Sequence, residues 1–238
     1  MCRLFASISQ ADPDLPYRKR ALEAFFALSN EHKDGWGIGR WADRGTEIVK
    51  EPVAAHESPR VKEESTRSVG PVLIAHIRWA SIGRNSLANT HPFNYGKWIY
   101  GHNGTLDFKG KLVSRMKPEY LQRIQGDTDS EVLFHWLLQN MDEHGEEQGM
   151  SSALGEVYRL RGTGTTALNF VLSDGDRLFA LNAPFTRFDH YGMSYLLRES
   201  ELIVCSQPLL GAEGWKRFPR DSLLVVGRNL ELRFHKIT

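Results

Sequence analysis

Apolar side chains follow two different periods along the first part of the chain. Short runs rich in apolar and β-branched residues are typical of strands, and they cover residues 2–9, 37–41, 46–50 and 72–79. Within residues 18–29, apolar residues recur at helical spacing instead. They predict an amphipathic helix whose apolar face holds Ala21, Leu22, Phe25, Phe26 and Leu28.

Turn and cap residues divide these elements. Turns are expected at Ala11-Asp12-Pro13-Asp14 and at Asp43-Arg44-Gly45, the second closing a hairpin. Ser58 followed by Pro59 predicts an N-cap and the start of a polar helix that runs to about residue 67. Three glycines around Trp36 suggest backbone that lies close to another segment.

The remainder of the chain predicts helices first and strands afterwards. A strand at 98–100 precedes a helix to about residue 141, which Thr128 and Glu131 open like a capping box. A polar loop at 142–148 and a helix at 152–160 are expected next. Further strands are predicted at residues 167–173, 177–182, 202–206, 222–226 and 231–237, with tight turns at 174–176 and 228–229. This order favours an α+β fold of antiparallel sheets covered by helices, in a single domain over residues 1–238.

Composition narrows the function classes. A net charge of +1 without a basic block argues against nucleic-acid binding. Two cysteines give no disulfide framework, which suits a reducing compartment, and no apolar run approaches the roughly 20 residues of a membrane helix. The sequence therefore predicts a cytoplasmic protein with neither nucleic acid nor a membrane as partner, and neither a cofactor nor a metal is expected.

Cys2 is the first candidate for chemistry. Once Met1 is removed, as we expect, Cys2 carries a thiol and a free α-amine on one residue. The amine has a reference pKa of about 7.7–8.0 and the thiol of about 8.5, so the amine can take the thiol's proton. This pair forms a nucleophile with its own general base.

Four further residues would serve attack on an amide. The Asn103 side chain and the Gly104 N–H are suited to bind a tetrahedral oxyanion. Arg78 offers a planar fork for a carboxylate, and Asp129, at a loop–helix junction, can meet an ammonium group.

These motifs resemble the class II glutamine amidotransferases. The resemblance rests on Cys2 after Met1, Arg78-Trp79, Asn89-Thr90-His91-Pro92-Phe93, His102-Asn103-Gly104 and Thr128-Asp129-Ser130-Glu131. The segment His32-Lys33-Asp34-Gly35-Trp36-Gly37 resembles the small stand-alone branch of that family, the YafJ type. The resemblance implies the N-terminal-nucleophile hydrolase fold, a four-layer αββα sandwich of two antiparallel sheets.

The resemblance also implies roles for site residues. Cys2 is the nucleophile, Asn103 with Gly104 forms the oxyanion hole, and Arg78 and Asp129 bind the carboxylate and the ammonium of glutamine. Of the remaining motif positions, Trp79 and Ser81 line the pocket, and His91 braces its loop by hydrogen bonding. Ser81 stands where relatives often have threonine and keeps the hydroxyl.

Other polar residues have simpler interpretations. His32 and Asp34 by themselves would fit a solvated turn. A core position is at least as good an explanation for His76, and a structural role for His102. Cys205 lies beside Ile203 and Val204, as expected of a buried packing thiol.

Three functions remain open from the sequence. The first is cleavage of the glutamine side-chain amide to glutamate and ammonia, with the ammonia-accepting partner unknown. The second is hydrolysis of a larger γ-glutamyl amide, with the choice of substrate made by loops 30–37 and 80–89. The third is a glutamine-binding regulatory module without turnover.

Overall fold

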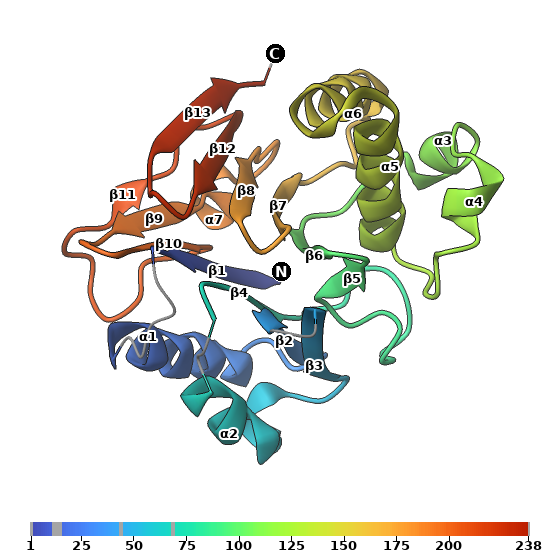
Figure 1. Cartoon of the computed structure of the whole chain (residues 1–238). Coiled ribbons are helices and arrows are strands. Elements are labelled where there is room, and N and C mark those ends of the chain that lie inside the picture. Colours follow the sequence, from blue (N-terminus) through green and yellow to red (C-terminus); the bar gives the residue numbers. More distant parts are fainter. Residues whose placement is uncertain (1, 11–15, 43–44, 68–69, 238) are drawn as a thin grey trace.

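Two antiparallel sheets form the centre of the computed structural model, which describes residues 2–10, 16–42, 45–67 and 70–237 (Figure 1). The first sheet has the order β11-β9-β10-β1-β4-β2-β3. Its strands are β1 (Arg3–Ser9), β2 (Trp36–Ala42), β3 (Gly45–Glu51), β4 (Val72–Ile77), β9 (Ser194–Leu197), β10 (Glu201–Cys205) and β11 (Lys216–Arg217). The second sheet has the order β13-β12-β8-β7-β6-β5. It contains β5 (Phe93–Tyr95), β6 (Trp98–Asn103), β7 (Asn169–Ser173), β8 (Arg177–Asn182), β12 (Ser222–Gly227) and β13 (Leu232–Lys236).

Helices cover the outer face of each sheet. Over the first sheet lie α1 (Pro16–Ala27), η1 (Leu28–Asn30), η2 (Ala55–Glu57) and α2 (Arg60–Thr66) (Figure 1). The second sheet is covered by α5 (Asp129–His144) and α6 (Glu146–Leu160), with α3 (Lys109–Val113) and α4 (Pro118–Leu121) beside them. The short α7 (Phe188–Tyr191) lies between β8 and β9 along the chain. The predicted four-layer αββα sandwich is confirmed.

Alternating side chains of the inner strands build three cores. In β1, Leu4, Ala6 and Ile8 face the opposite sheet, whereas Phe5 faces α1. In β7, Val171 packs between the sheets, whereas Phe170 packs toward α5 and α6. Both faces of these strands are therefore buried, which explains why three successive residues within each, 4–6 and 170–172, are apolar.

The polar loop predicted at residues 142–148 is wrong. The helix α5 continues to His144, a single residue breaks it, and α6 begins at Glu146. That residue is Gly145, whose φ of 81° is readily adopted only by glycine. A Cβ at Gly149 would overlap the Asn140 carbonyl, so this second glycine lets the two helices pack closely. Polar composition here marked the exposed side of a helix rather than a loop.

The two predicted caps have different outcomes. Thr128 caps α5, because its hydroxyl accepts from the Glu131 N–H at 3.2 Å. In a capping box the Glu131 carboxylate would accept from the Thr128 N–H. Here it accepts instead from the N–H groups of Gln125 (3.0 Å) and Gly126 (2.7 Å), in the loop before the helix. The Ser58 hydroxyl bonds the Glu51 carboxylate, and Ser58 gives α2 no side-chain cap.

Short elements escaped the sequence-based prediction. These are β5, β9, β11, α3, α4 and α7, each of five residues or fewer and without a full period of its own. The predicted turn at 11–14 lies outside the described residues, and so do residues 43 and 44 of the predicted hairpin turn.

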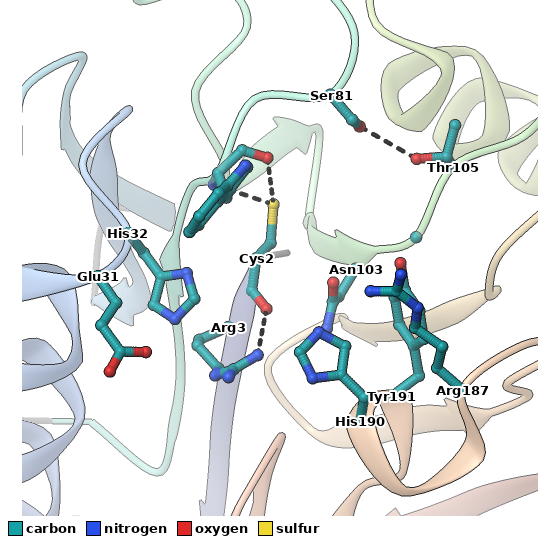
Figure 2. A pocket seen from close by; sticks show the side chains of 12 residues that line it. Cys2, Arg3, Glu31, His32, Ser81, Asn103, Thr105, Arg187, His190 and Tyr191 are labelled. Atoms are coloured by element: carbon teal, nitrogen blue, oxygen red, sulfur yellow. Dashed lines mark hydrogen bonds between the residues drawn. The ribbon is translucent and has the colours of Figure 1, made fainter.

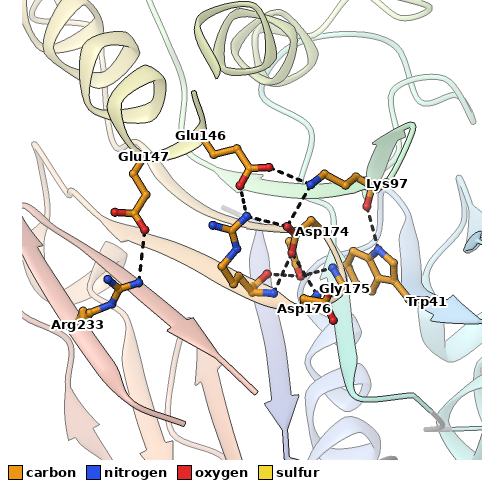
Figure 3. A network of polar contacts seen from close by, with 10 residues as sticks. Trp41, Lys97, Glu146, Glu147, Asp174, Gly175, Asp176 and Arg233 are labelled. Atoms are coloured by element: carbon orange, nitrogen blue, oxygen red, sulfur yellow. Dashed lines mark hydrogen bonds and ion pairs between the residues drawn. The ribbon is translucent and has the colours of Figure 1, made fainter. Parts of the chain in front are cut away.

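A polar network joins the two sheets to α6 (Figure 3). Lys97, between β5 and β6, pairs with Glu146 at 2.9 Å and with Asp174 of the β7–β8 turn at 3.4 Å. Arg177 pairs with the same two carboxylates. From the first sheet, the Trp41 indole donates to the Lys97 carbonyl at 2.9 Å. The Asp174 side chain is only 5% exposed, whereas Lys97 is 54% exposed, so the network is shielded from solvent at Asp174 and open to it at Lys97.

Candidate active site

Cys2 lies at one end of the sandwich, immediately before β1. In the pairing of β1 with β4, Arg3 faces Ile77, so Cys2 meets the segment that follows Ile77. The Trp79 N–H donates to the Cys2 sulfur at 3.4 Å, and the thiol donates to the Trp79 carbonyl at 3.5 Å (Figure 2). Backbone pairing of two inner strands therefore fixes the sulfur.

The Cys2 thiol needs a base. Burial raises its pKa above the ordinary value, and the negative charge of Asp129 acts in the same direction. The hydrogen bond from Trp79 and the positive charge of Arg78 lower the pKa, but burial has the larger effect. The resting group is therefore a thiol, and its activation needs a proton acceptor.

A pocket of about 430 Å³ opens at Cys2. This volume lies in the range of small-molecule sites. Figure 2 shows the side chains that surround it. The lining residues come from both ends of the sequence and from its middle: Cys2, Arg3, Glu31, His32, Trp79, Ser81, Asn103, Gly104, Thr105, Arg187, His190 and Tyr191.

Asn103 is the last residue of β6, in the second sheet, and Gly104 follows it. The Asn103 side chain is 2% exposed, and its Nδ2 has no hydrogen-bond partner within the described residues. A buried amide donor without a partner is costly, which makes it suited to a group that arrives with the substrate. A Cβ on Gly104 would overlap the Ala167 carbonyl, so only glycine permits this approach of the two chain segments.

Trp79 and Ser81 lie on the pocket wall, where they were predicted. Trp79 is 47% exposed, and its ring meets the His32 ring edge-on at a centroid distance of 5.6 Å. The Ser81 hydroxyl shares a 3.0 Å hydrogen bond with the Thr105 hydroxyl (Figure 2). This bond connects the segment after β4 with the segment after β6.

The segment 32–37 braces the same wall, rather than forming a solvated turn. The Asp34 carboxylate accepts from the Ala80 N–H at 2.7 Å, and the Arg78 N–H donates to the Gly35 carbonyl at 2.8 Å. A Cβ on Gly37 would overlap the His91 carbonyl, so the close backbone approach predicted around Trp36 is present there.

Arg78 and Asp129 lie behind the pocket wall. Each is 3% exposed, and neither lines the pocket. The Arg78 guanidinium donates to the carbonyls of residues 82–84 and to the Asn85 side chain, at 3.0–3.3 Å. Asp129 accepts from the Leu106 N–H at 2.6 Å. Both groups therefore hold loops beside the pocket in this structure.

The predicted hydrogen bonding of His91 is wrong. Neither ring nitrogen of His91 has a hydrogen-bond partner in the described part of the chain. The ring instead stacks on His76 at a centroid distance of 4.1 Å and contacts Phe93 at 4.4 Å. Within the described residues, His91 thus contributes ring packing behind the wall rather than a hydrogen bond.

The other two histidines and Cys205 are buried as expected. His76 Nε2 lies 3.1 Å from the His102 carbonyl oxygen, and His102 Nδ1 lies 2.8 Å from the Ser130 hydroxyl. The Cys205 side chain is inaccessible, and burial raises its pKa to about 12. Cys2 is therefore the better nucleophile of the two cysteines.

Sequence reasoning missed the wall formed by the last third of the chain. Arg187, His190 and Tyr191 reach the pocket from α7 and the residue before it (Figure 2). Arg187 has a φ of 44°, in the left-handed region. The isolated stretch Arg187-Phe188-Asp189-His190-Tyr191 has no periodicity that would have marked it. Arg3 was missed as a pocket residue as well, although it adjoins Cys2, whereas Glu31 belongs to the loop 30–37 to which the choice of substrate was assigned.

The described part of the chain offers neither a metal site nor a membrane-spanning helix. Among the described residues, no group of three or more His, Cys, Asp or Glu side chains is arranged to hold a metal ion. Within the same residues, no helix has the length and apolar character needed to cross a membrane.

Comparison with known proteins agrees with this geometry. Residues 1–202 match the family described as glutamine amidotransferases class-II. The putative glutamine amidotransferase YafJ of Escherichia coli K12 is 28% identical, with 91% of this chain and 94% of that protein covered. The probable glutamine amidotransferase DUG3 of Saccharomyces cerevisiae is 32% identical, with 81% of this chain and 69% of that protein covered.

A solved structure extends the agreement to the fold. The glutamine aminotransferase class-II domain protein from Silicibacter pomeroyi has a TM-score of 0.73 at 19% identity, with both chains covered completely. The family match spans most of the chain and includes Cys2, Asn103 and Gly104. The chain therefore belongs to the class II glutamine amidotransferases and is an enzyme of that class.

Proposed function

We propose that this protein hydrolyses the side-chain amide of glutamine through a thioester on Cys2. The α-amine of Cys2, free once Met1 is removed, takes the thiol proton, and the sulfur attacks the amide carbon. The proton then passes to the leaving nitrogen, ammonia departs, and a γ-glutamyl thioester remains. Water, deprotonated by the same amine, hydrolyses the thioester and releases glutamate. Met1 itself lies outside the described residues.

The observation that carries this proposal is the Asn103 amide. Its Nδ2 donor is buried and has no partner among the residues that the structure describes, and Asn103 lines the same pocket as Cys2. The oxygen of a tetrahedral intermediate would supply the missing acceptor, with the Gly104 N–H as a second donor. One such donor contributes about 2.7–4 kcal/mol to transition-state stabilisation in comparable sites.

Arg78 and Asp129 are proposed to bind the carboxylate and the ammonium of the substrate. Arg78 now donates to loop oxygens, so a substrate carboxylate would have to replace part of these bonds. Its electrostatic effect on the Cys2 pKa indicates that it lies near the reacting sulfur. We further propose that residues 1–238 form one domain.

Glutamate release from glutamine tests the proposal. The protein should begin at Cys2 by intact mass, and it should release glutamate. Cys2→Ala should abolish release, whereas Cys205→Ser serves as the matched control and should retain most of it. If Cys2→Ala keeps full activity, the thioester mechanism is wrong. Saturable glutamine binding with no turnover in the unmodified protein would favour the regulatory module instead.

A second candidate is hydrolysis of a larger γ-glutamyl amide with an anionic leaving amine. The observation that favours it is the group of Arg3, Arg187 and His190 on the pocket wall (Figure 2). Within the described residues, no carboxylate forms an ion pair with either arginine. Glutamine releases only ammonia and makes no use of the two guanidinium groups, whereas an amino acid released from γ-glutamyl-glycine would carry a carboxylate to them.

A matched substrate pair distinguishes the two candidates. The charged substrate is γ-glutamyl-glycine, and the neutral one is γ-glutamyl-ethylamide. The second candidate predicts a higher kcat/KM for the charged substrate and loss of this preference in Arg187→Gln. Equal rates on both substrates, with glutamine preferred, would exclude it and leave the glutaminase proposal intact.

A further inference from the structure

A second polar pocket lies apart from Cys2, and the proposed reaction does not use it. It has a volume of about 210 Å³ and shares no lining residue with the Cys2 pocket. It is enclosed by β3, β5, the segment after α4, and α5. Its lining residues are Lys50, Ala88, Phe93, Asn94, Tyr95, Gln122, Arg123, Gln125, Glu131 and His135.

Arg123 is held in place by two aromatic rings. Its guanidinium carbon lies 4.2 Å from the ring centroid of Tyr95 and 4.2 Å from that of Tyr120. Stacking of this kind fixes the plane of the guanidinium and leaves its N–H groups free for acceptors in that plane. Nη1 is buried, and no described residue accepts a hydrogen bond from it. Arg123 is therefore a fixed cationic donor whose Nη1 has no acceptor in the described part of the chain.

His135 supplies a second buried polar atom. The residue is 3% exposed, lines the pocket, and has no partner for Nδ1 within the described residues. Burial, with a smaller contribution from Arg123, lowers the pKa of His135 to about 4. The ring is consequently neutral at pH 7, and in one tautomer its Nδ1 donates a hydrogen bond.

Lys50 supplies a second cation. Its ammonium donates to the carbonyls of Thr90 at 2.7 Å and Pro92 at 3.4 Å, which accounts for two of its three protons. Burial lowers its pKa to about 8, while the negative charge of Glu131 acts in the opposite direction. The side chain thus remains largely charged at pH 7.

The charged residues that line this pocket have a net positive charge. Glu131 is the single carboxylate among the lining residues, and both its oxygens already accept backbone N–H groups. Lys50 and Arg123 give +2 and Glu131 gives −1, so the lining carries a formal +1. A monoanion would neutralise the pocket, and a planar acceptor would match the guanidinium plane.

We propose that this pocket binds a small monocarboxylate, which accepts hydrogen bonds from the Arg123 guanidinium, the Lys50 ammonium and the His135 ring. The bound ligand would also steady the loop that leads to the Cys2 pocket. Lys50 holds that loop at residues 90 and 92, and the Asn89 side chain donates to the Arg84 carbonyl, which in turn accepts from Arg78.

Acetate is the probe, with acetamide as its neutral isostere and sodium chloride as the ionic-strength control. The full chain is titrated with each while the melting temperature and the His135 ring signals in the NMR spectrum are followed. Acetate should raise the melting temperature saturably and shift His135. Acetamide and chloride should do neither.

Two variants and one control locate the effect. Arg123→Gln should weaken acetate binding at least about tenfold, since it removes a charge-assisted bond. His135→Gln gives a second, independent loss should Arg123→Gln fail to fold. Arg115→Gln, which removes an arginine paired with Glu156 outside the pocket, should bind acetate as the parent does. The proposal is overturned by equal effects of acetate and acetamide, by undiminished binding in both pocket variants, or by tighter binding of phosphate than of acetate.

Discussion

Acidification from pH 7.5 to 5.0 should destabilise this protein through its buried histidines. His76, His91, His102 and His135 are each no more than 3% exposed. Burial lowers the pKa of His76 to about 3 and that of His135 to about 4. It also lowers the pKa of His91 and that of His102. Unfolding exposes these rings to water, where their ordinary pKa is 6.5.

Proton binding by the unfolded chain determines the direction in which the free energy of unfolding changes. Below pH 6.5 these histidines bind protons in the unfolded chain but not in the folded one. The free energy of unfolding therefore decreases as the pH is lowered, until the pH reaches the pKa of the folded histidine. At pH 5.0 each such histidine is 1.5 pH units below 6.5, which costs about 2 kcal/mol. His76 and His135 together therefore cost about 4 kcal/mol, a large part of a typical total of about 5–15 kcal/mol.

Other titrating groups determine the choice of pH. The carboxylates of Glu47 and Asp107 have lowered pKa values. Their contribution to the free energy of unfolding is therefore lost only when the pH falls below their ordinary pKa of about 4. Glu201 acts in the opposite direction, because burial raises its pKa. Measurement at pH 5.0 thus isolates the histidines better than measurement at pH 3 or 4.

Urea unfolding at pH 7.5, 6.0 and 5.0 measures the effect, in buffers that contain no carboxylate. The free energy of unfolding should fall by about 4 kcal/mol or more over this range. In His135→Gln the fall should be smaller by about 2 kcal/mol, whatever the variant's stability at pH 7.5. An unchanged free energy at pH 5.0, or a variant with the full pH dependence, would show that these rings are not neutral in the folded protein.

Four substitutions extend the test to the site and the fold. Asn103→Ala should lower kcat by about 100- to 1,000-fold with little change in KM; steady-state kinetics with a pure KM effect would make Asn103 a ground-state contact. Gly104→Ala should reduce activity and melting temperature together, because its Cβ would displace the Ala167 carbonyl; a fully active and stable variant would contradict that contact. Arg78→Ala should lower kcat/KM at least about 100-fold on glutamine and on bulkier γ-glutamyl amides alike, and a loss confined to one substrate would refute the shared role. Asp174→Ala should lower stability by about 1–3 kcal/mol in urea while leaving kcat near that of the parent, and an unchanged midpoint would mean that the polar network of Figure 3 adds nothing.

Much of the fold could be predicted because both sheets are buried on their two faces. Strands such as 72–77 and 202–205 are buried at every position, and His76 is the one polar residue in them; helix 129–144 has a cap and a clear period. Local physics sufficed for these elements. It failed at residues 142–148, where one glycine at positive φ separates two helices and polar residues cover their exposed side.

The chemistry of the pocket could also be predicted in part. Cys2, Trp79, Ser81, Asn103 and Gly104 line one cavity, as their motifs implied. Their residue types suffice for this prediction, because a nucleophile and oxyanion donors are recognisable from side-chain chemistry and a short stretch of backbone.

Only the tertiary structure decided which groups face the cavity and which are already engaged. Arg78 is charged in any fold, but the sequence does not reveal that loop carbonyls surround its guanidinium. His91 has polar nitrogens, yet its neighbours across the sandwich are rings. Arg187 and His190 reach Cys2 from more than 180 residues away, through contacts between strands and loops that no local pattern encodes. Partners of this kind depend on long-range packing, and therefore the sequence by itself determined the elements and the reactive groups, whereas the packing of the two sheets determined their surroundings.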